Sequence, residues 1–247
     1  MFCYAYGLAV NGAKVAIIGR NKEKLAKMSE TLTENAKNEY SKEATVKGYS
    51  CNVLDKEELV KTYEQIKAAL GSCDILINGA GGNQPGAIAS VKMLKKEKQE
   101  DDYSFWDLKE ENIRNVMDLN YMGTLLPYPG IYQRYGGKEK GKHYQYRFCF
   151  LYPSSFQGYG LFQCKKRCPE PDSVLAIHFG QSGIRCNAIV PGFYAAEQNH
   201  DLLFNKDGSY TDRAGDIIAG TPMGRFGNPE ELIGAACFWQ VMMQPAL

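Results

Sequence analysis

The sequence predicts an α/β protein built on a parallel β-sheet. Three short apolar segments, Lys14–Gly19, Ala44–Val53 and Asp74–Asn78, have the composition of buried strands. Charged segments of helical character separate them, at Arg20–Tyr40 and Asp55–Leu70. Strands that alternate with helices are typical of a parallel sheet with crossover helices, so this order predicts the fold class.

The segment Cys73–Gly82 predicts where a ligand would meet this sheet. Its apolar run Ile75–Ile77 is followed by the sequence NGAGG. Small residues let a ligand approach the backbone closely, and ligands of open α/β sheets bind outside the carboxyl ends of the strands. We therefore expect this strand to end against a cofactor. The alternative is a strand that runs into a glycine-rich turn without a ligand.

The other elements follow from local signals. Asp55 has the position of an N-cap, with Glu58 three residues later. A long helix is expected from Phe105 to about Leu126. Order returns near Leu175 with a helix that ends in glycine, then a strand and proline turn in IRCNAIVPGF, and Pro229 is expected to begin the last helix.

Composition excludes several classes of protein. The 247 residues fit one large α/β domain or two small ones, and a net charge of +1 provides no general attraction to nucleic acid or to anionic membranes. Eight scattered cysteines in so long a chain indicate free thiols in a reducing, cytoplasmic setting. The apolar start lacks a basic leading region, and no run of about 18 apolar residues predicts a membrane span.

Residues 128–174 depart from the α/β pattern. They are rich in Tyr, Gly, Lys and Gln, with only scattered strand-like pieces. A structureless segment of this length inside a compact domain counts against an ordinary assignment. The basic run Arg134–Arg147 is similar to a nucleic-acid patch, but charge runs are usually solvated, and we expect no nucleic-acid partner.

Histidine and cysteine residues in and near this interval do not predict a metal site. Cys164 and Cys168 lie near His143 and His178 in sequence, but their spacing is not that of a zinc finger. We expect no metal.

Four segments, taken together and in this order, resemble the short-chain dehydrogenase/reductase family. They are Asn78–Gly81, Leu119–Gly123, Gly183–Gly192 and Pro222–Glu231. The resemblance covers roughly residues 1–126 and 175–236. Three further segments are similar to the D-mannonate oxidoreductase (fructuronate reductase) branch of the family: Gly123–Pro127, Gln198–Asn199 and Leu202–Arg213.

The resemblance implies a Rossmann-like, doubly wound parallel sheet in a single dinucleotide-binding domain over residues 1–247. It implies NAD or NADP as cofactor, hydride transfer with a small-molecule substrate, and a homo-oligomer, since family members often form tetramers. The branch implies interconversion of a sugar acid, such as D-mannonate, and its keto form.

Family positions transfer to this chain residue by residue. Arg20 follows the second family strand, where an arginine suits the 2′-phosphate of NADP. Asn120 and Lys165 match catalytic positions, and Asn199 and Arg213 are substrate candidates because a carboxylate would accept hydrogen bonds from an arginine. The residues that the resemblance assigns to the cofactor are Arg20, Asn52, Val53, Asn78, Ala80, Gly81, Pro191 and Gly192.

The chain also departs from the family pattern. Met1–Ala9 has the character of the family's first helix, so the first strand and its glycine-rich phosphate loop are missing, and so is the last strand. The family's general acid/base is the tyrosine of a Tyr-x-x-x-Lys motif, whose lysine lowers a phenol pKa of about 10. Tyr135, Tyr144 and Tyr159 lack a lysine four residues later.

A shifted reading frame would explain the absence of this motif. Codon degeneracy lets Leu161–Lys165 become Tyr-Ser-Ser-Ala-Lys, and Lys142–Phe148 become Asn-Ile-Ile-Asn-Ile-Ala-Ser, the family's strand with its catalytic serine. We therefore interpret residues 128–174 as a frameshifted interval, and residues 237–247 as shifted the opposite way.

On this interpretation Phe148 occupies the serine position and Leu161 the tyrosine position, so the chain as written would be inactive. The alternative to a frameshift is a true divergent insertion in an otherwise normal enzyme. The alternative function is that of a non-catalytic pseudoenzyme or cofactor-binding remnant.

Overall fold

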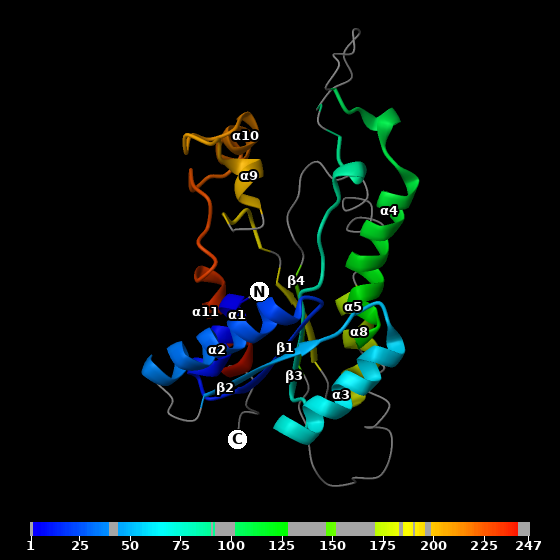
Figure 1. The fold of residues 1–247 in the computed structure, drawn as a ribbon, viewed down its shortest axis with the longest axis vertical. Helices are drawn as coiled ribbons and strands as arrows, with labels where there is room; N and C mark the ends of the chain where they lie inside the picture. The colour runs from blue at the N-terminus through cyan, green and yellow to red at the C-terminus, as the bar shows by residue number, and fades with distance from the viewer. Residues whose placement is uncertain are drawn as a thin grey trace.

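The chain is an α/β fold of parallel strands with helices packed around them (Figure 1). The computed structural model describes residues 2–39, 44–89, 91, 102–127, 147–151, 171–182, 185–189, 191–195 and 199–241. Residues beyond Val241, where the last strand was expected to be missing, lie outside these ranges.

The amino-terminal part alternates helices and strands as the sequence predicts. Its elements are α1 (Phe2–Val10), β1 (Lys14–Gly19), α2 (Lys22–Glu39), β2 (Thr45–Ser50), α3 (Lys56–Leu70) and β3 (Ile75–Asn78). β1 pairs with β2 in parallel, from Lys14 opposite Thr45 to Gly19 opposite Ser50. The second strand is shorter than the predicted Ala44–Val53, because the chain turns after Cys51 toward the N-cap of α3.

Among the remaining elements, the helix expected from Phe105 differs from its prediction. They are η1 (Pro85–Ala87), η2 (Phe105–Asp107), α4 (Glu110–Met117), the π-helical turn η3 (Asp118–Met122), α5 (Gly123–Leu125), β4 (Arg147–Leu151), α8 (Pro171–Phe179), η4 (Gly180–Ser182), β5 (Arg185–Ile189), α9 (His200–Leu203), α10 (Asp212–Ala219) and α11 (Glu231–Val241). The helix expected from Phe105 begins at Glu110, after a separate turn capped by Ser104 and Asp107.

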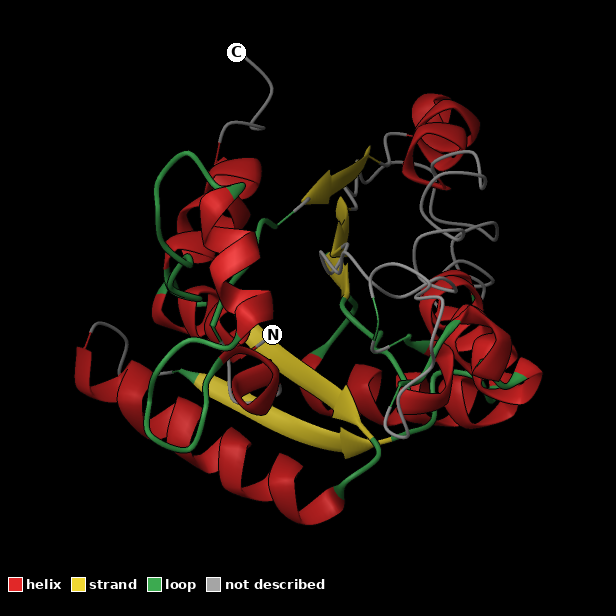
Figure 2. Cartoon of the chain, turned by 90° about the horizontal axis from the view of Figure 1, so that it is seen from above, coloured by secondary structure: helices red, strands yellow, loops and turns green. Residues whose placement is uncertain are grey.

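The described strands form two separate parallel sheets, β1–β2 and β3–β4–β5, visible as two groups of arrows in Figure 2. Among the described residues, no strand pairs with the outer edge of β1 or of β3. β4 comes from the interval 128–174, in which the sequence shows only scattered strand-like pieces. Arg147 pairs with Ile75 of β3 and with Arg185 of β5, so the interval supplies the middle strand of the second sheet.

Helix α1 packs on the edges of both sheets. Ala5, Leu8 and Ala9 of α1 are buried in a cluster against which Ile17 of β1 and Ile77 of β3 also pack. Its first turn reaches further, because Tyr4 is buried against Ile189 at the end of β5. The predicted helix at the start of the chain is thereby confirmed, and it is central to the core.

The predicted N-cap of α3 agrees with the structure, whereas the last helix begins later than predicted. The Asp55 carboxylate accepts a 2.9 Å hydrogen bond from the Glu58 backbone N–H and caps α3. Glu58 in turn accepts a 2.9 Å bond from the Asn52 N–H, which closes the turn that follows β2. The last helix begins at Glu231 rather than Pro229, because Pro229 lies in the preceding turn.

Two further features concern only the described part of the chain. None of its helices combines the length and the apolar character that crossing a membrane requires. It also contains no group of three or more His, Cys, Asp or Glu side chains placed to hold a metal ion. Cys164, Cys168 and His143 lie outside the described residues.

Candidate cofactor and active site

The end of β3 carries a buried amide with an unused donor. Asn78 is the last residue of the strand and only 6% exposed, and its Nδ2 has no hydrogen-bond partner among the described residues. Ala80 and Gly81 follow it in a half-buried turn. A buried donor without an acceptor is costly, so each such group needs a physical explanation, and a role in a functional site is one.

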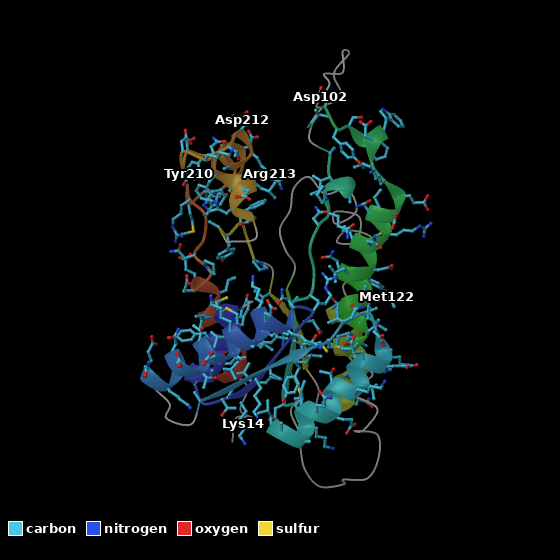
Figure 3. All side chains as sticks on the ribbon, viewed as in Figure 1. Lys14, Asp102, Met122, Tyr210, Asp212 and Arg213 are labelled. Atoms are coloured by element: carbon cyan, nitrogen blue, oxygen red, sulfur yellow. The ribbon has the colours of Figure 1, made fainter. Side chains whose placement is uncertain are left out.

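Asn120 holds this turn from the facing helix. Its Nδ2 donates to the Gly82 carbonyl at 2.8 Å and to the Val116 carbonyl at 2.7 Å. Its Oδ1 accepts a 3.3 Å bond from the Gly82 N–H. Asn120 sits in the π-helical turn η3, which also contains the Met122 labelled in Figure 3. Such turns occur frequently at functional sites, and here one places Asn120 beside the end of β3.

The same helix also meets the end of β2. A Cβ built on Gly123 would lie 3.1 Å from Cγ2 of Val53 and 3.8 Å from Cδ2 of Leu54. Glycine therefore allows the helix that carries Asn120 to pack closely on Val53. The carboxyl ends of β2 and β3 consequently lie on the same side of the fold, next to one helix.

Arg20 and Asn52 lie together at the ends of β1 and β2. The Cys51 N–H donates to the Gly19 carbonyl at 2.9 Å, and the Ser50 hydroxyl to the Arg20 carbonyl at 3.4 Å. Both Arg20 and Asn52 are exposed. Asn52 also shapes the turn, because its Oδ1 accepts a 3.2 Å bond from the Leu54 N–H.

Pro191 and Gly192 follow β5 and lead into a small lobe. The Phe193 carbonyl accepts a 2.9 Å bond from the Gly227 N–H. Asn199 donates from Nδ2 to the Tyr194 carbonyl at 2.9 Å, so this predicted substrate residue holds the lobe onto the end of β5.

The lobe consists of α9, α10 and the chain around Phe226. Leu203, Ala214 and Phe226 form its buried centre. Arg213 is half-buried on α10, and its burial lowers the pKa of its guanidinium from the ordinary value. Figure 3 labels Arg213 beside Asp212 and Tyr210, in the lobe rather than at the strand ends.

An ion pair joins this lobe to α11. Arg225 Nη2 lies 2.6 Å from Glu231 Oε1, and the Asn228 N–H donates to Glu231 Oε2 at 2.8 Å. The Arg225 side chain, helped by the Asn228 N–H, lowers the pKa of Glu231 to about 2.

Two thiols beside the strands, Cys51 after β2 and Cys73 before β3, are poor nucleophiles. Burial raises the pKa of Cys73 to about 11, although a hydrogen bond with the Ile75 backbone acts in the opposite direction. Burial also raises the pKa of Cys51. Because the thiolate is the reactive form, neither cysteine suits nucleophilic chemistry near neutral pH.

The structure brings some of the predicted site residues together and leaves others apart. The turn at Asn78, Ala80 and Gly81 is joined to Asn120, and Val53 packs on the same helix. Arg20 and Asn52 lie at adjoining strand ends, whereas Asn199 and Arg213 belong to the lobe. Lys165 and Leu161 lie outside the described residues.

The position of Phe148 corrects one expectation. The shifted frame predicts a strand over 142–147, with the serine position directly after it. In the structure Phe148 lies inside β4, opposite Leu76 and Cys186. β4 continues past Phe148 to Leu151. Residues 142–146 lie outside the described residues.

Gly82, the partner of Asn120, is not among the predicted site residues. The signal for it in the sequence is the second glycine of the Gly81–Gly82 pair.

Comparison with known proteins identifies the family. A family model for short chain dehydrogenases matches residues 2–142. An uncharacterised oxidoreductase of Haemophilus influenzae is 36% identical over 231 residues, which is 94% of this chain and 79% of that protein. An uncharacterised oxidoreductase of Bacillus subtilis is 37% identical over 234 residues, with 92% of this chain and 78% of that protein covered.

Solved structures agree with this assignment. A crystal structure from Haemophilus influenza with bound NAD, provisionally named a D-mannonate oxidoreductase, is 33% identical, with a TM-score of 0.74 and 94% and 90% of the two chains covered. NAD⁺-bound xylitol dehydrogenase has the same fold at 20% identity, with a TM-score of 0.74 over 96% of this chain and 77% of that one. The chain belongs to the short-chain dehydrogenase family, whose members are NAD(P)-dependent oxidoreductases.

Proposed function

We propose that this chain binds NAD or NADP at the carboxyl ends of its strands and that its reaction is the interconversion of a sugar acid, such as D-mannonate, and its keto form. The observation that carries the proposal is the joint placement of Asn78–Gly82, Asn120 and Val53 next to one helix. Sheet ends of this kind are where α/β proteins bind nucleotides.

The residues present fit the two ends of a dinucleotide. Arg20, exposed at the end of β1, suits a 2′-phosphate on the adenosine ribose, which favours NADP, and Asn52 and Val53 would flank the adenine. The unsatisfied Nδ2 of Asn78 and the turn through Ala80 and Gly81 would lie near the nicotinamide half. When bound, the cofactor supplies or accepts a hydride.

The pyrophosphate of the cofactor would lie near the start of α1. Tyr4, in the first turn of this helix, packs against Ile189 at the carboxyl end of β5. The free N–H groups of a helix N-terminus and its dipole favour a phosphate. Pro191 and Gly192, which follow β5, would contact the nicotinamide side.

The sugar-acid assignment rests on the lobe and on the relatives. Arg213, half-buried on α10, would bind the substrate carboxylate as a charge-assisted pair. The relative that is 33% identical carries the provisional name D-mannonate oxidoreductase. Asn199 would position α9 and the lobe rather than touch the substrate, because its amide binds the Tyr194 carbonyl.

We further propose that this chain, as written, turns its substrate over poorly. Proton transfer would require the family's tyrosine beside Lys165, and Leu161 cannot exchange a proton. The frameshift hypothesis for residues 128–174 accounts for this difference. One observation that supports it is that the family model ends at residue 142, inside that interval.

A spectrophotometric assay tests both parts of this proposal. The printed chain and a chain with residues 128–174 in the shifted frame are each mixed with NADPH and fructuronate. We expect oxidation of NADPH only by the second chain. Turnover by the printed chain would overturn the proposed defect, and no turnover by either chain with any hexuronate would overturn the sugar-acid assignment. Sequencing the coding DNA from Leu125 to Leu175 tests the frameshift separately.

The second candidate is a pseudoenzyme that binds the cofactor without turnover. Leu161 at the family's tyrosine position favours the pseudoenzyme if the coding frame is uninterrupted. It predicts binding of NADPH by the printed chain and a divergent, correctly read interval. Either form would assemble as a homo-oligomer if it follows its family.

A further inference from the structure

The turn that follows β3 carries amide groups whose donors have no acceptor. Asn78, Asn83 and Gln84 lie within seven residues of one another. The Nδ2 of Asn78 is buried without a partner, and neither Asn83 Nδ2 nor Gln84 Nε2 donates a hydrogen bond among the described residues. Asn83 and Gln84 are both half-buried. Three unused amide donors on one partly buried turn suit a ligand that is rich in oxygen atoms.

One side of the helical segment α4–η3 holds this turn at two places. Asn120 binds both backbone groups of Gly82. Asn112 donates from Nδ2 to Oε1 of Gln84 at 3.0 Å. Asn112, Val116 and Asn120 are spaced by four residues, so they share one side of the helix. The turn therefore runs along the helix from Asn120 toward Asn112, and in Figure 1 the chain beyond β3 rises beside α4.

Gly86 allows the amide of Asn112 to lie close to the turn. A Cβ on Gly86 would lie 2.7 Å from Cγ of Asn112 and 2.9 Å from its Nδ2. The Gly86 carbonyl also accepts a 2.9 Å hydrogen bond from the Lys109 N–H, where α4 begins. Ala87 and Val116 are buried together beside these contacts. The turn is thus fixed to α4, and the side chain that Asn112 binds is held in one orientation.

This orientation leaves the donors of Gln84 for a ligand. Because its Oε1 accepts from Asn112, the amide presents the two N–H groups of Nε2. Gln84 lies two residues beyond Gly82, next to the proposed nicotinamide half of the site. In Figure 1 the α9–α10 lobe, where Arg213 would bind the substrate carboxylate, lies on the other side of this chain from α4. The hydroxylated carbon chain of the substrate would therefore lie near Gln84.

We propose that Gln84 is a specificity-determining residue that donates a hydrogen bond from Nε2 to a hydroxyl oxygen of the sugar acid, and that Asn112 is the positioning residue that orients it. This inference rests on the proposed function, which places a hydroxylated substrate beside the turn. A site built to bind a substrate hydroxyl discriminates against analogues that lack it. Gln84 thereby favours polyhydroxy acids over their deoxy counterparts.

Ligand-observed nuclear magnetic resonance titrations test this proposal on the full chain saturated with NADPH. The probes are D-mannonate, which cannot react with the reduced cofactor, and a set of analogues that each lack one hydroxyl group. We expect one analogue to bind the unchanged chain about tenfold more weakly than D-mannonate, because it lacks one hydrogen bond. Gln84→Met keeps the length of the side chain and removes its donors. It should weaken D-mannonate binding by the same factor and abolish the difference between D-mannonate and that analogue.

A matched control uses the same substitution elsewhere. Gln65→Met, at an exposed glutamine of α3, should leave the affinity for D-mannonate and for each analogue within twofold. The affinity for NADPH should remain within twofold in both variants, which a general collapse of the site would not allow.

A double-mutant cycle tests the role of Asn112. Asn112→Ala should weaken D-mannonate binding about three- to tenfold, because the Gln84 amide is no longer held. It should have no further effect in the Gln84→Met background, since Asn112 acts through Gln84. Asn115→Ala, on the exposed side of α4, is the control for this change and should have no effect.

Binding of D-mannonate by Gln84→Met within twofold of the unchanged chain would overturn the proposal. An equal loss of affinity for D-mannonate and for every deoxy analogue would also overturn it, because it would indicate a structural role only. If the unchanged chain binds NADPH but none of these acids, the sugar-acid part of the proposed function fails, and this inference fails with it. If the chain binds D-mannonate and only the effect of Gln84→Met is missing, the proposed function stands without this inference.

Discussion

Asn120 is the residue on which the candidate site most depends. One amide side chain binds both backbone groups of Gly82 and the carbonyl of its own helix at Val116. It thereby fixes the distance between the end of β3 and the helix η3. The sequence predicts this asparagine through the family motif, but its partner Gly82 becomes evident only in the folded chain.

Replacement of this side chain should loosen the turn. Asn120→Ala leaves two backbone groups of Gly82 without their partner, so we expect it to lower the free energy of unfolding by about 1–3 kcal/mol. Urea denaturation measures the change. Asn115→Ala, on the exposed side of α4, is the matched control and should remain within about 0.5 kcal/mol. If Asn120→Ala had the same urea midpoint as the wild-type chain, this would contradict the role of the Asn120 side chain in holding the turn at Gly82.

Glu231 makes part of the stability depend on pH. Its pKa is about 2 in the folded chain and near 4.5 in a free side chain, so the Arg225 pair stabilises the fold above pH 4.5. This contribution is lost as the pH falls from 4.5 through about 2, where the carboxylate takes up a proton in the folded state as well. Both side chains are partly exposed, and solvent screening keeps the effect small.

A charge variant isolates this effect. Arg225→Gln should flatten the fall of the thermal midpoint between pH 5 and about pH 2.5, since the pKa of Glu231 then approaches its ordinary value. Lys206→Gln, at another exposed cation of the lobe, should keep the wild-type slope. Thermal unfolding followed by circular dichroism provides the curves, and identical slopes for Arg225→Gln and wild type would count against the pair.

At the scale of elements, sequence patterns predict the strands and helices whose signals are local. β1, β3, α2 and α3 fall where apolar runs, helical spacing and the Asp55 cap place them. The bounds of β4 were not predicted, because RFCFL lies among tyrosines and glycines, and its pairing with Ile75 and Arg185 is a contact between distant parts of the chain. The predicted Phe105–Leu126 helix is divided for a similar reason. η1 and α4 pack on each other through Ala87 and Val116, a contact between separate segments of the chain.

The contact between α1 and α11 depends on a glycine. A Cβ on Gly7 would overlap the Cγ2 methyl of Ile233, so Gly7→Ala should destabilise the fold by about 1–3 kcal/mol. In an Ile233→Ala background the overlap is removed, and the same change should be neutral or stabilising by up to about 1 kcal/mol, the helix propensity gain of alanine.

Gly215 on α10 is the matched control for Gly7. Nothing lies within 4 Å of a Cβ built there, so Gly215→Ala should stabilise by up to about 1 kcal/mol. The four variants are compared by chemical denaturation as a double-mutant cycle with this control. A gain in stability from Gly7→Ala alone would show that the two helices are not in close contact.

At the scale of the whole molecule, the division into two sheets is the main feature. Within the described residues, β1 pairs with β2 alone and β3 pairs with β4 alone, so the sheets β1–β2 and β3–β4–β5 are not joined by a hydrogen-bonded strand. The position of the lobe could not be predicted, because Asn199 and Arg225 hold it through contacts that leave no periodic signal in the sequence.

Amide exchange should report the division directly. Both backbone groups of a residue in a parallel strand point to the same side, so alternate amides of β1 lack a partner. We expect protection at every second residue of Lys14–Gly19, and at consecutive residues of β4, which has neighbours on both sides. Nuclear magnetic resonance exchange rates distinguish the two patterns. Continuous protection along β1 would mean that its outer edge is paired.

The most direct test of the account is a calorimetric titration of the printed chain with NADPH and with NADH. The central claim is that Arg20, Asn52, Val53, Asn78 and Asn120 lie at one cofactor site. We expect the chain to bind NADPH. Arg20→Glu should weaken this binding about 10- to 100-fold, because it removes one charge-assisted hydrogen-bonding partner. Lys37→Glu, at the far end of α2, should bind NADPH with an affinity within twofold of the wild-type value. Arg20→Glu should weaken the binding of NADH less than that of NADPH. Absence of binding by both dinucleotides, or equal binding by Arg20→Glu and wild type, would contradict the claim.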